Sequence, residues 1–206
     1  MNTSLYWTTA LLLCGLLVLL NPGRDPGLPA SGGLTTSASQ SLPADDGQDD
    51  FDFSIGTWVT RMSLLDNRLT DSTAWIEYEG TSVVRPIWNG RANMVELDVA
   101  GPTGSIVGLS LRLYDPNSGQ WSLYYANSRS SSIYPPVIGG FKDGRGEFFG
   151  QEIIDGRSTF VRFVITQRSQ NSWHYEQAFS DDGGVTWESN WIAVDTRVEG
   201  ESDGTP

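Results

Sequence analysis

The stretch FDFSIGTW, residues 51–58, places Gly56 and Trp58 at the entrance of the first predicted strand. The last predicted strand ends with DTR, residues 195–197, and so with Arg197. A flat guanidinium can cover the face of an indole ring while its N–H groups donate to backbone carbonyls at a strand end. We therefore expect Gly56, Trp58 and Arg197 to close one end of the fold, where the first and last strands meet.

Between these two ends, strand-like segments alternate with short polar turns. The turns include Asn89-Gly90, Asp143-Gly144 and Asp155-Gly156, which favour tight hairpins. Turns this short connect antiparallel neighbours, and no segment has a helical period with caps. About ten strands are predicted from this pattern. They are residues 57–65, 73–88, 92–99, 105–114, 120–127, 137–141, 146–154, 157–167, 172–180 and 186–197.

The edges of such a meander decide the architecture. A long antiparallel meander has exposed edges unless it closes on itself. We therefore predict an all-β fold, a closed antiparallel up-and-down β-barrel of about ten strands. A β-sandwich is the alternative architecture.

The stretch SDDGGVTW, residues 180–187, matches the Asp-box pattern S-x-D-x-G-x-T-W, a hairpin motif of sialidases and other β proteins. Sialidases carry several such boxes, away from the active site. In one small domain, a single box indicates a structural turn and not sialidase activity. Side chains of such a turn bond its amides, and glycine supplies positive φ. The turn residues we expect are Ser180, Asp182, Gly184, Thr186 and Trp187.

Three motifs together resemble the DUF1579-like bacterial families of unknown function, which are related in fold to the lipocalin and calycin barrels. They are FDFSIGTW, the pair Leu113-Tyr114-Asp115 and Gly119-Gln120-Trp121, and SDDGGVTWESNW near the end. The resemblance spans residues 51–197. It implies a lipocalin-like barrel with an interior cavity and an exported location, and it implies no established activity.

The N-terminal region predicts export. Residues 10–20 (ALLLCGLLVLL) form an apolar run of the length of a signal-peptide core. We assign residues 1–30 to a signal peptide or an uncleaved N-terminal anchor, which remains the alternative. Residues 31–50 form a disordered linker, residues 51–198 the barrel domain and residues 199–206 a flexible tail. The expected location is secreted or periplasmic. The protein would be attached to a membrane only if the N-terminal segment stays uncleaved.

Composition excludes several partners and cofactors. The net charge of −12 repels nucleic acid and anionic membrane surfaces. The one cysteine, Cys14, lies in the apolar run, and the one histidine is His174. Zinc sites built from several His or Cys are therefore excluded, and no phosphate loop or dinucleotide fingerprint is present. We expect no metal and no cofactor, while the oligomeric state stays open.

The hairpin near the C-terminus supplies the first candidate ligand residues. If Gln167 pairs with Ser172, then Arg162, Tyr175 and Gln177 share one face with several aromatic residues. Apolar walls with a few directional polar groups are typical of a ligand cavity. A buried Arg162 would need a carboxylate, from an acidic ligand or from Glu152 on the preceding strand. Alternatively, protein neighbours or solvent satisfy these polar groups.

A second group of candidates precedes the irregular segment 128–136. Tyr124 and Asn127 end the strand before it. Loops at the open end of a barrel often carry function, so the segment is a candidate lid, and a rigid surface corner is the alternative.

These observations predict an exported barrel that binds a small, partly apolar molecule in its interior. Two alternatives stay open: an enzyme on the same scaffold acting on a small hydrophobic substrate, or an interaction domain of the cell envelope. No catalytic motif is recognisable, so enzymatic activity is less favoured than binding.

Overall fold

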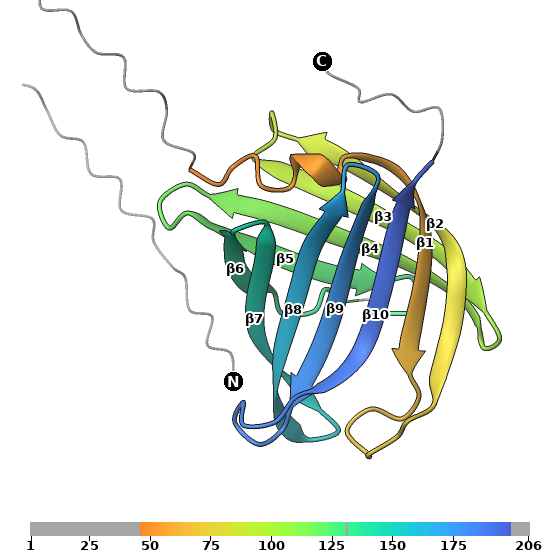
Figure 1. Cartoon of the computed structure of the whole chain (residues 1–206). Helices are drawn as coiled ribbons and strands as arrows, with labels where there is room; N and C mark the ends of the chain where they lie inside the picture. The colour runs from red at the N-terminus through yellow and green to blue at the C-terminus, as the bar shows by residue number, and fades with distance from the viewer. Residues whose placement is uncertain (1–45, 131, 199–206) are drawn as a thin grey trace, which may run out of the picture. The chain divides into compact units, whose positions relative to one another are not determined.

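The computed structural model describes residues 46–130 and 132–198, and within them the chain folds into ten strands preceded by one short 3-10 helix (Figure 1). The predicted signal peptide, most of the predicted linker and the predicted tail lie outside the described residues. No helix of the described part is long and apolar enough to cross a bilayer. The elements are η1 (Asp52–Ser54), β1 (Gly56–Leu65), β2 (Trp75–Ile87), β3 (Ala92–Gly101), β4 (Gly104–Asp115), β5 (Gln120–Asn127), β6 (Val137–Lys142), β7 (Arg145–Ile154), β8 (Arg157–Ser169), β9 (Ser172–Ser180) and β10 (Glu188–Arg197).

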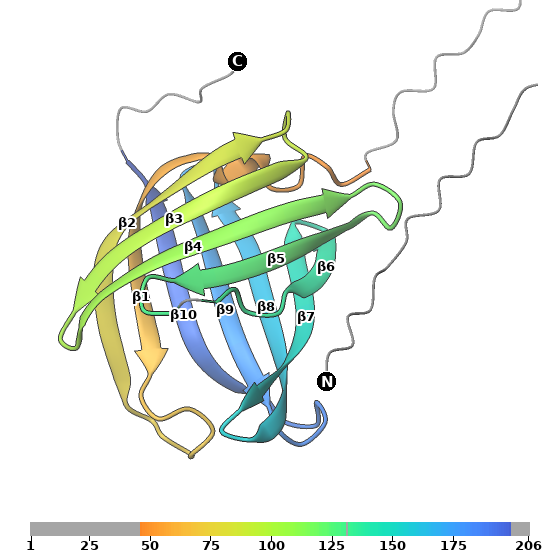
Figure 2. The same cartoon turned by 180° about the vertical axis from the view of Figure 1, so that it is seen from behind.

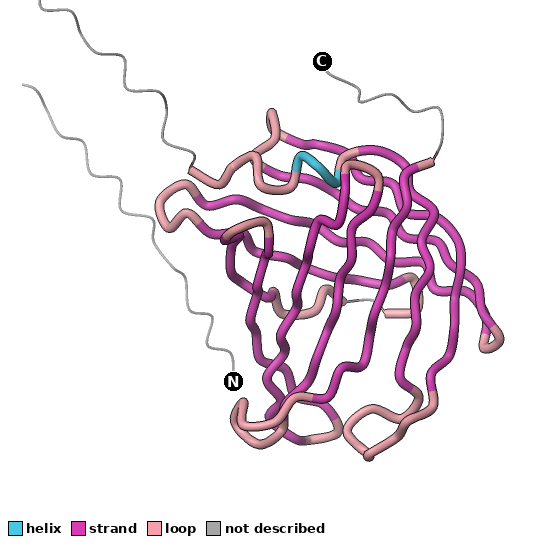
Figure 3. The backbone as a smooth tube through the Cα atoms, viewed as in Figure 1, coloured by secondary structure: helices cyan, strands magenta, loops and turns pink. Residues whose placement is uncertain are grey.

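The strands form a closed antiparallel barrel. Each strand pairs with the next along the chain, and β10 pairs with β1 to close the sheet (Figure 3). In this last ladder Trp58 is the register partner of Arg197. The predicted all-β, up-and-down barrel is therefore confirmed.

Turn chemistry explains two of the hairpins. Asp143-Gly144 and Asp155-Gly156 all have positive φ, at 52° and 74° in the first pair and 49° and 76° in the second. Two successive positive φ values make the mirror-image turn whose twist matches that of antiparallel strands. These dipeptides thus set the β6–β7 and β7–β8 connections.

Aromatic side chains fill one end of the barrel, the closed end. Helix η1 lies at this end, opposite the β1–β2 and β9–β10 loops (Figure 1). Phe51, beside η1, is 1% exposed and packs edge-on against Trp121 and Phe141. Trp58 is equally buried, and its indole N–H donates to the Ser54 carbonyl at 2.8 Å. The closed end is therefore a packed core.

Arg197 covers Trp58 at the closed end. Its guanidinium carbon lies 4.2 Å from the indole centroid. Its two terminal nitrogens donate to the carbonyls of Ile55 at 2.9 Å and Phe53 at 3.1 Å. Gly56 begins β1 with a φ of 125°, beside these bonded carbonyls.

The ordered contacts begin before Phe51. Asp46 and Gly47, which the sequence predicts to be part of the linker, bond to the barrel. The Tyr114 hydroxyl donates to the Asp46 carbonyl, and the Trp121 indole N–H donates to the Gly47 carbonyl at 2.9 Å. The end of the predicted linker therefore lies against β4 and β5.

The predicted register between β8 and β9 is wrong by one residue. Ile165, and not Val164, is the partner of Tyr175, and a bulge between Gln167 and Ser169 lets Ser169 pair with Ser172. Because side chains alternate with a period of two, a shift of one residue exchanges the faces of β8 relative to β9.

Candidate functional site

A cavity of about 850 Å³ occupies the barrel interior beyond the aromatic closed end. Every strand contributes to its lining, as do the β1–β2 loop and part of the segment between β5 and β6. Aliphatic and aromatic side chains dominate the walls, among them Val95, Leu97, Ile106, Leu123 and Phe163. The interior is thus packed with aromatic residues at one end and hollow beyond them.

Arg112 on β4 lies at the floor of the cavity. It is 4% exposed, and its guanidinium carbon lies 4.4 Å from the centroid of the Phe51 ring and 5.7 Å from that of Trp173. One terminal nitrogen donates to the Ser54 hydroxyl at 3.2 Å. Burial lowers the pKa of Arg112 to about 10, and Asp195 acts in the opposite direction. Arg112 therefore stays a cation at neutral pH.

Asp195 on β10 is the second charged residue at the floor. It is 1% exposed, and its Oδ1 accepts hydrogen bonds from the hydroxyls of Thr60 on β1 and Ser82 on β2, the latter at 3.0 Å. Burial raises the pKa of Asp195 to about 6, although both hydroxyls and Arg112 oppose that rise. The carboxylate is held in one orientation by two neighbouring strands.

Polar atoms at the floor are left without a partner. Arg112 Nε, Trp173 Nε1 and Asp195 Oδ2 are buried, and none has a hydrogen-bond partner among the described residues. All three residues line the cavity. Such atoms are uncommon in folded proteins and call for an explanation. Two donors and one acceptor at the cavity floor are therefore left unsatisfied by the described residues.

Tyr175 on β9 stands next to this floor. Its hydroxyl accepts a hydrogen bond from the Trp191 indole N–H at 3.1 Å. Burial, followed by the charge of Asp195, raises the pKa of Tyr175 well above its ordinary value. The phenol is thus a neutral hydrogen-bonding group at neutral pH.

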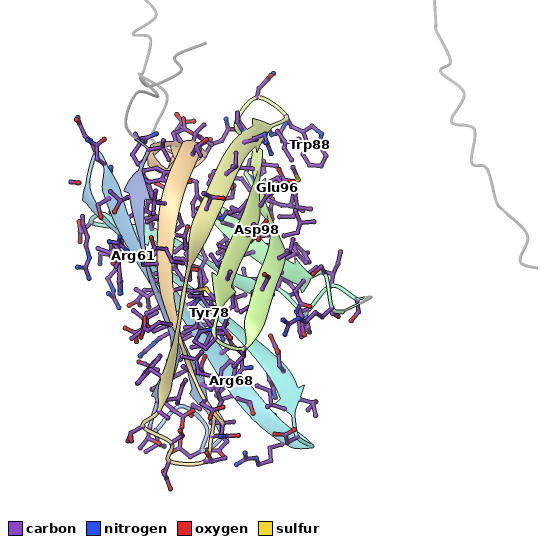
Figure 4. The ribbon with its side chains drawn as sticks, turned by 90° about the vertical axis from the view of Figure 1, so that its right-hand side faces the viewer. Arg61, Arg68, Tyr78, Trp88, Glu96 and Asp98 are labelled. Atoms are coloured by element: carbon purple, nitrogen blue, oxygen red, sulfur yellow. The ribbon has the colours of Figure 1, made fainter. Side chains whose placement is uncertain are left out.

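Charged residues mark the opposite end of the cavity. Arg68 lies in the β1–β2 loop, at the end of the barrel away from Trp88 in the β2–β3 turn (Figure 4). Its guanidinium carbon lies 5.8 Å from the centroid of Phe179. Burial raises the pKa of Glu152, which also lines the cavity, and the nearby Arg68 opposes this. The polar groups of the mouth are therefore separate from those of the floor.

Four of the predicted ligand residues line this cavity: Tyr175, Gln177, Tyr124 and Asn127. Gln177 donates to the Asn190 side-chain oxygen at 2.9 Å. Tyr124 alternates with Leu123 and Tyr125 along β5, so it points mainly to the other side of the sheet.

Arg162 does not line the cavity. It pairs with Phe149 and Ala178 across the sheet, and its guanidinium carbon lies 4.7 Å from the Trp187 ring centroid on the outer face. Glu152 lines the cavity, so it is not the carboxylate partner that was considered for Arg162. The one-residue register shift between β8 and β9 accounts for this correction.

The stretch 180–187 folds into a local turn between β9 and β10. Gly184 N donates to Ser180 Oγ at 2.8 Å, and Asp182 accepts from Thr186 N and Thr186 Oγ1. The two bonds from Thr186, followed by one from the Ser180 hydroxyl, lower the pKa of Asp182 to about 2. The Trp187 indole N–H donates to the Gly184 carbonyl at 3.1 Å.

The segment between β5 and β6 lies beside β5 (Figure 2). Tyr134 N donates to the Tyr125 carbonyl at 2.9 Å, and the two rings stack with centroids 6.0 Å apart. Tyr134 and Pro135 also line the cavity. The proposed lid therefore contacts the site, through residues that also pack against the wall.

Sequence reasoning missed the floor residues. Neither Arg112 nor Asp195 is among the ligand residues that the sequence predicts. No group of three or more His, Cys, Asp or Glu side chains within residues 46–130 and 132–198 is placed to hold a metal. The polar side chains at or beside the floor include those of Arg112, Asp195, Trp173 and Tyr175.

Comparison with solved structures identifies similar barrels. The S-type phycobiliprotein lyase CPES from Guillardia theta matches with a TM-score of 0.53 at 11% identity, covering 74% of this chain and 92% of that one. EF1p2_mFAP2b bound to DFHBI matches with a TM-score of 0.41 at 11% identity over 74% and 99% of the two chains. A de novo designed fluorescence-activating β-barrel matches with a TM-score of 0.40 at 14% identity over 73% and 98% of the two chains.

Neither a family model nor a curated protein matches the sequence. The resemblance to the DUF1579-like families therefore stays a prediction. The likeness to the lyase shows the fold alone, a closed antiparallel β-barrel.

Proposed function

We propose that this protein binds a small, partly apolar molecule inside its barrel. The observation that carries the proposal is the cavity of about 850 Å³ with apolar walls and unpartnered polar atoms at its floor. Small-molecule sites typically have volumes of roughly 300–1,000 Å³, apolar walls and a few placed polar groups. Export of the protein and the DUF1579-like relationship remain part of this proposal.

The test uses the full chain and the neutral fluorescent probe N-phenyl-1-naphthylamine. Ser110 and Leu109 are neighbours on β4, but Ser110 lines the cavity whereas Leu109 is 41% exposed on the outer face. Ser110→Phe is expected to weaken probe binding by about 10-fold or more, because the added ring occupies the cavity. Leu109→Phe is the matched control and leaves binding unchanged.

Two results would overturn the binding proposal. One is a wild-type protein that does not take up the probe. The other is equal binding by the wild type and Ser110→Phe, when circular dichroism shows that both are folded.

One observation favours a second candidate, an enzyme on the same scaffold. Tyr175 and Asp195 lie in one cavity, and both have raised pKa values. A carboxyl group with a pKa of about 6 is suited to proton transfer near neutral pH. Mass spectrometry of methyl 2-naphthoate after incubation with the protein tests for ester hydrolysis. Recovery of the unchanged ester supports binding alone. Formation of 2-naphthoate by the wild type, but not by Tyr175→Phe or Asp195→Asn, supports catalysis.

A further inference from the structure

The floor of the cavity specifies a chemical class of ligand, an inference that rests on the proposed binding function. We propose that the ligand has a neutral head group with a hydrogen-bond acceptor beside an N–H donor, as in a carboxamide, and that this group bridges Arg112 and Asp195. The apolar body of the ligand then lies along the walls above them.

Three buried polar atoms at the floor lack a hydrogen-bond partner among the described residues. Arg112 Nε and Trp173 Nε1 are donors that lack an acceptor in the described part of the chain, and Asp195 Oδ2 is an acceptor that lacks a donor there. The three residues are only 4%, 2% and 1% exposed. A head group that offers a carbonyl oxygen to the donors and an N–H to the carboxylate satisfies both kinds of atom.

The floor carries two opposite charges, on Arg112 and Asp195. Arg112 and Asp195 interact electrostatically, yet they are not among the ion pairs formed by the described residues. Their opposite charges balance, so the floor has no net charge to attract an ion. A carboxylate head group would meet the Asp195 carboxylate, and an ammonium would meet the Arg112 guanidinium. In a buried site either contact is strongly unfavourable, which leaves a neutral dipolar group.

Protein contacts fix the two charged side chains of the floor. The Ser54 hydroxyl and the Phe51 ring hold the Arg112 guanidinium, and the Thr60 and Ser82 hydroxyls hold Asp195 Oδ1. These contacts leave Arg112 Nε and Asp195 Oδ2 as atoms of the two side chains without a partner in the described part of the chain. Because the protein itself fixes both side chains, little conformational entropy is lost when the head group binds.

The experiment compares four probes with one ring system and different head groups: 2-naphthamide, methyl 2-naphthoate, 2-naphthoate and 2-naphthylmethylammonium. Calorimetry with the full chain at pH 7.5 is expected to rank 2-naphthamide first, by about 10-fold or more over the other three. The ester lacks the N–H, and the two ions carry an unbalanced charge.

Asp195→Asn provides the sharper test. Thr60 and Ser82 donate to Oδ1, so an Asn amide keeps its oxygen there and turns its NH₂ toward the ligand. An acceptor is thereby replaced with a donor and a negative charge is removed. The preference is expected to invert, with 2-naphthoate gaining and 2-naphthamide losing about 10-fold or more. Thr196→Asn, at the exposed neighbouring position of β10, is the matched control and leaves the ranking unchanged.

The outcomes separate this inference from the binding proposal. If N-phenyl-1-naphthylamine binds and Ser110→Phe blocks it, but the four probes bind equally, bind in another order or do not bind, the head-group inference is overturned alone. If N-phenyl-1-naphthylamine fails as well, both proposals fall. A ranking that survives Asp195→Asn in a folded variant also overturns the inference.

Discussion

Arg197 lies over Trp58, with its guanidinium carbon 4.2 Å from the ring centroid, and the two residues are register partners on the strands that close the barrel. This contact joins the last strand to the first. It also satisfies the backbone carbonyls of Phe53 and Ile55, which lead into β1. One side chain thus stabilises both the seam of the barrel and its closed end.

Arg197→Ala is expected to lower the free energy of unfolding by about 2–4 kcal/mol, because two hydrogen bonds and a cation–π contact are lost. Urea denaturation followed by tryptophan fluorescence measures this. Arg61→Ala is the control, since Arg61 pairs with Glu79 while its side chain is 73% exposed. Such an exposed pair contributes about 0.5 kcal/mol. Equal effects of the two substitutions would contradict the role given to Arg197.

Gly139 and Gly140 on β6 are expected to respond differently to the same substitution. A Cβ at Gly139 would lie 1.9 Å from the backbone oxygen of Glu147, whereas one at Gly140 meets nothing closer than 3.7 Å. Gly139→Ala must therefore displace the β6–β7 ladder and lower the free energy of unfolding by about 1–3 kcal/mol or more. Gly140→Ala is tolerated. Thermal melts of the two variants that coincide would refute this.

Asp195 is expected to make stability depend on pH. Burial raises its pKa to about 6 in the folded protein from an ordinary value of 3.8, so the folded state holds this proton more tightly than the unfolded state. Its contribution to stability is complete below pH 3.8 and is lost as the pH rises through about 6. A pKa difference of this size corresponds to about 3 kcal/mol.

The measurement is the difference in unfolding free energy between Asp195→Asn and the wild type from pH 3.5 to 7.5. The groups that contact Asp195 or interact with its charge are Thr60, Ser82, Arg112 and Tyr175, and neither Arg112 nor Tyr175 titrates in this range. The relative stability of the variant should therefore rise through the window from pH 4 to 6. A flat difference would show that the carboxyl group titrates normally.

Arg162→Ala is expected to leave the affinity for N-phenyl-1-naphthylamine within about 2-fold of the wild type, because this side chain stacks on Trp187 outside the cavity. The loss of that contact lowers the free energy of unfolding by about 0.5–1 kcal/mol. Fluorescence titration and urea denaturation measure the two effects. A 10-fold loss of affinity in a folded variant would show that Arg162 contributes to ligand binding after all.

β4 places a leucine outside and polar side chains inside, and this explains why the floor could not be predicted. Leu109 is 41% exposed on the outer face, whereas Ser110 and Arg112 point inward and line the cavity. A pattern analysis places leucine inside and arginine outside. On β4 this expectation is wrong, because the inward positions face a cavity with a polar floor and not a packed apolar core.

The sequence by itself determined the ten strands and the closed barrel, since turn dipeptides such as Asp143-Gly144 and Asp155-Gly156 act locally. The tertiary structure alone decided which side chains line the cavity. A bulge between Gln167 and Ser169 shifted one ladder by a residue and turned Arg162 outward. Closure of the barrel brought Arg112 of β4 and Asp195 of β10 to one cavity floor. The register depends on the packing of all strands together, and no local segment encodes it.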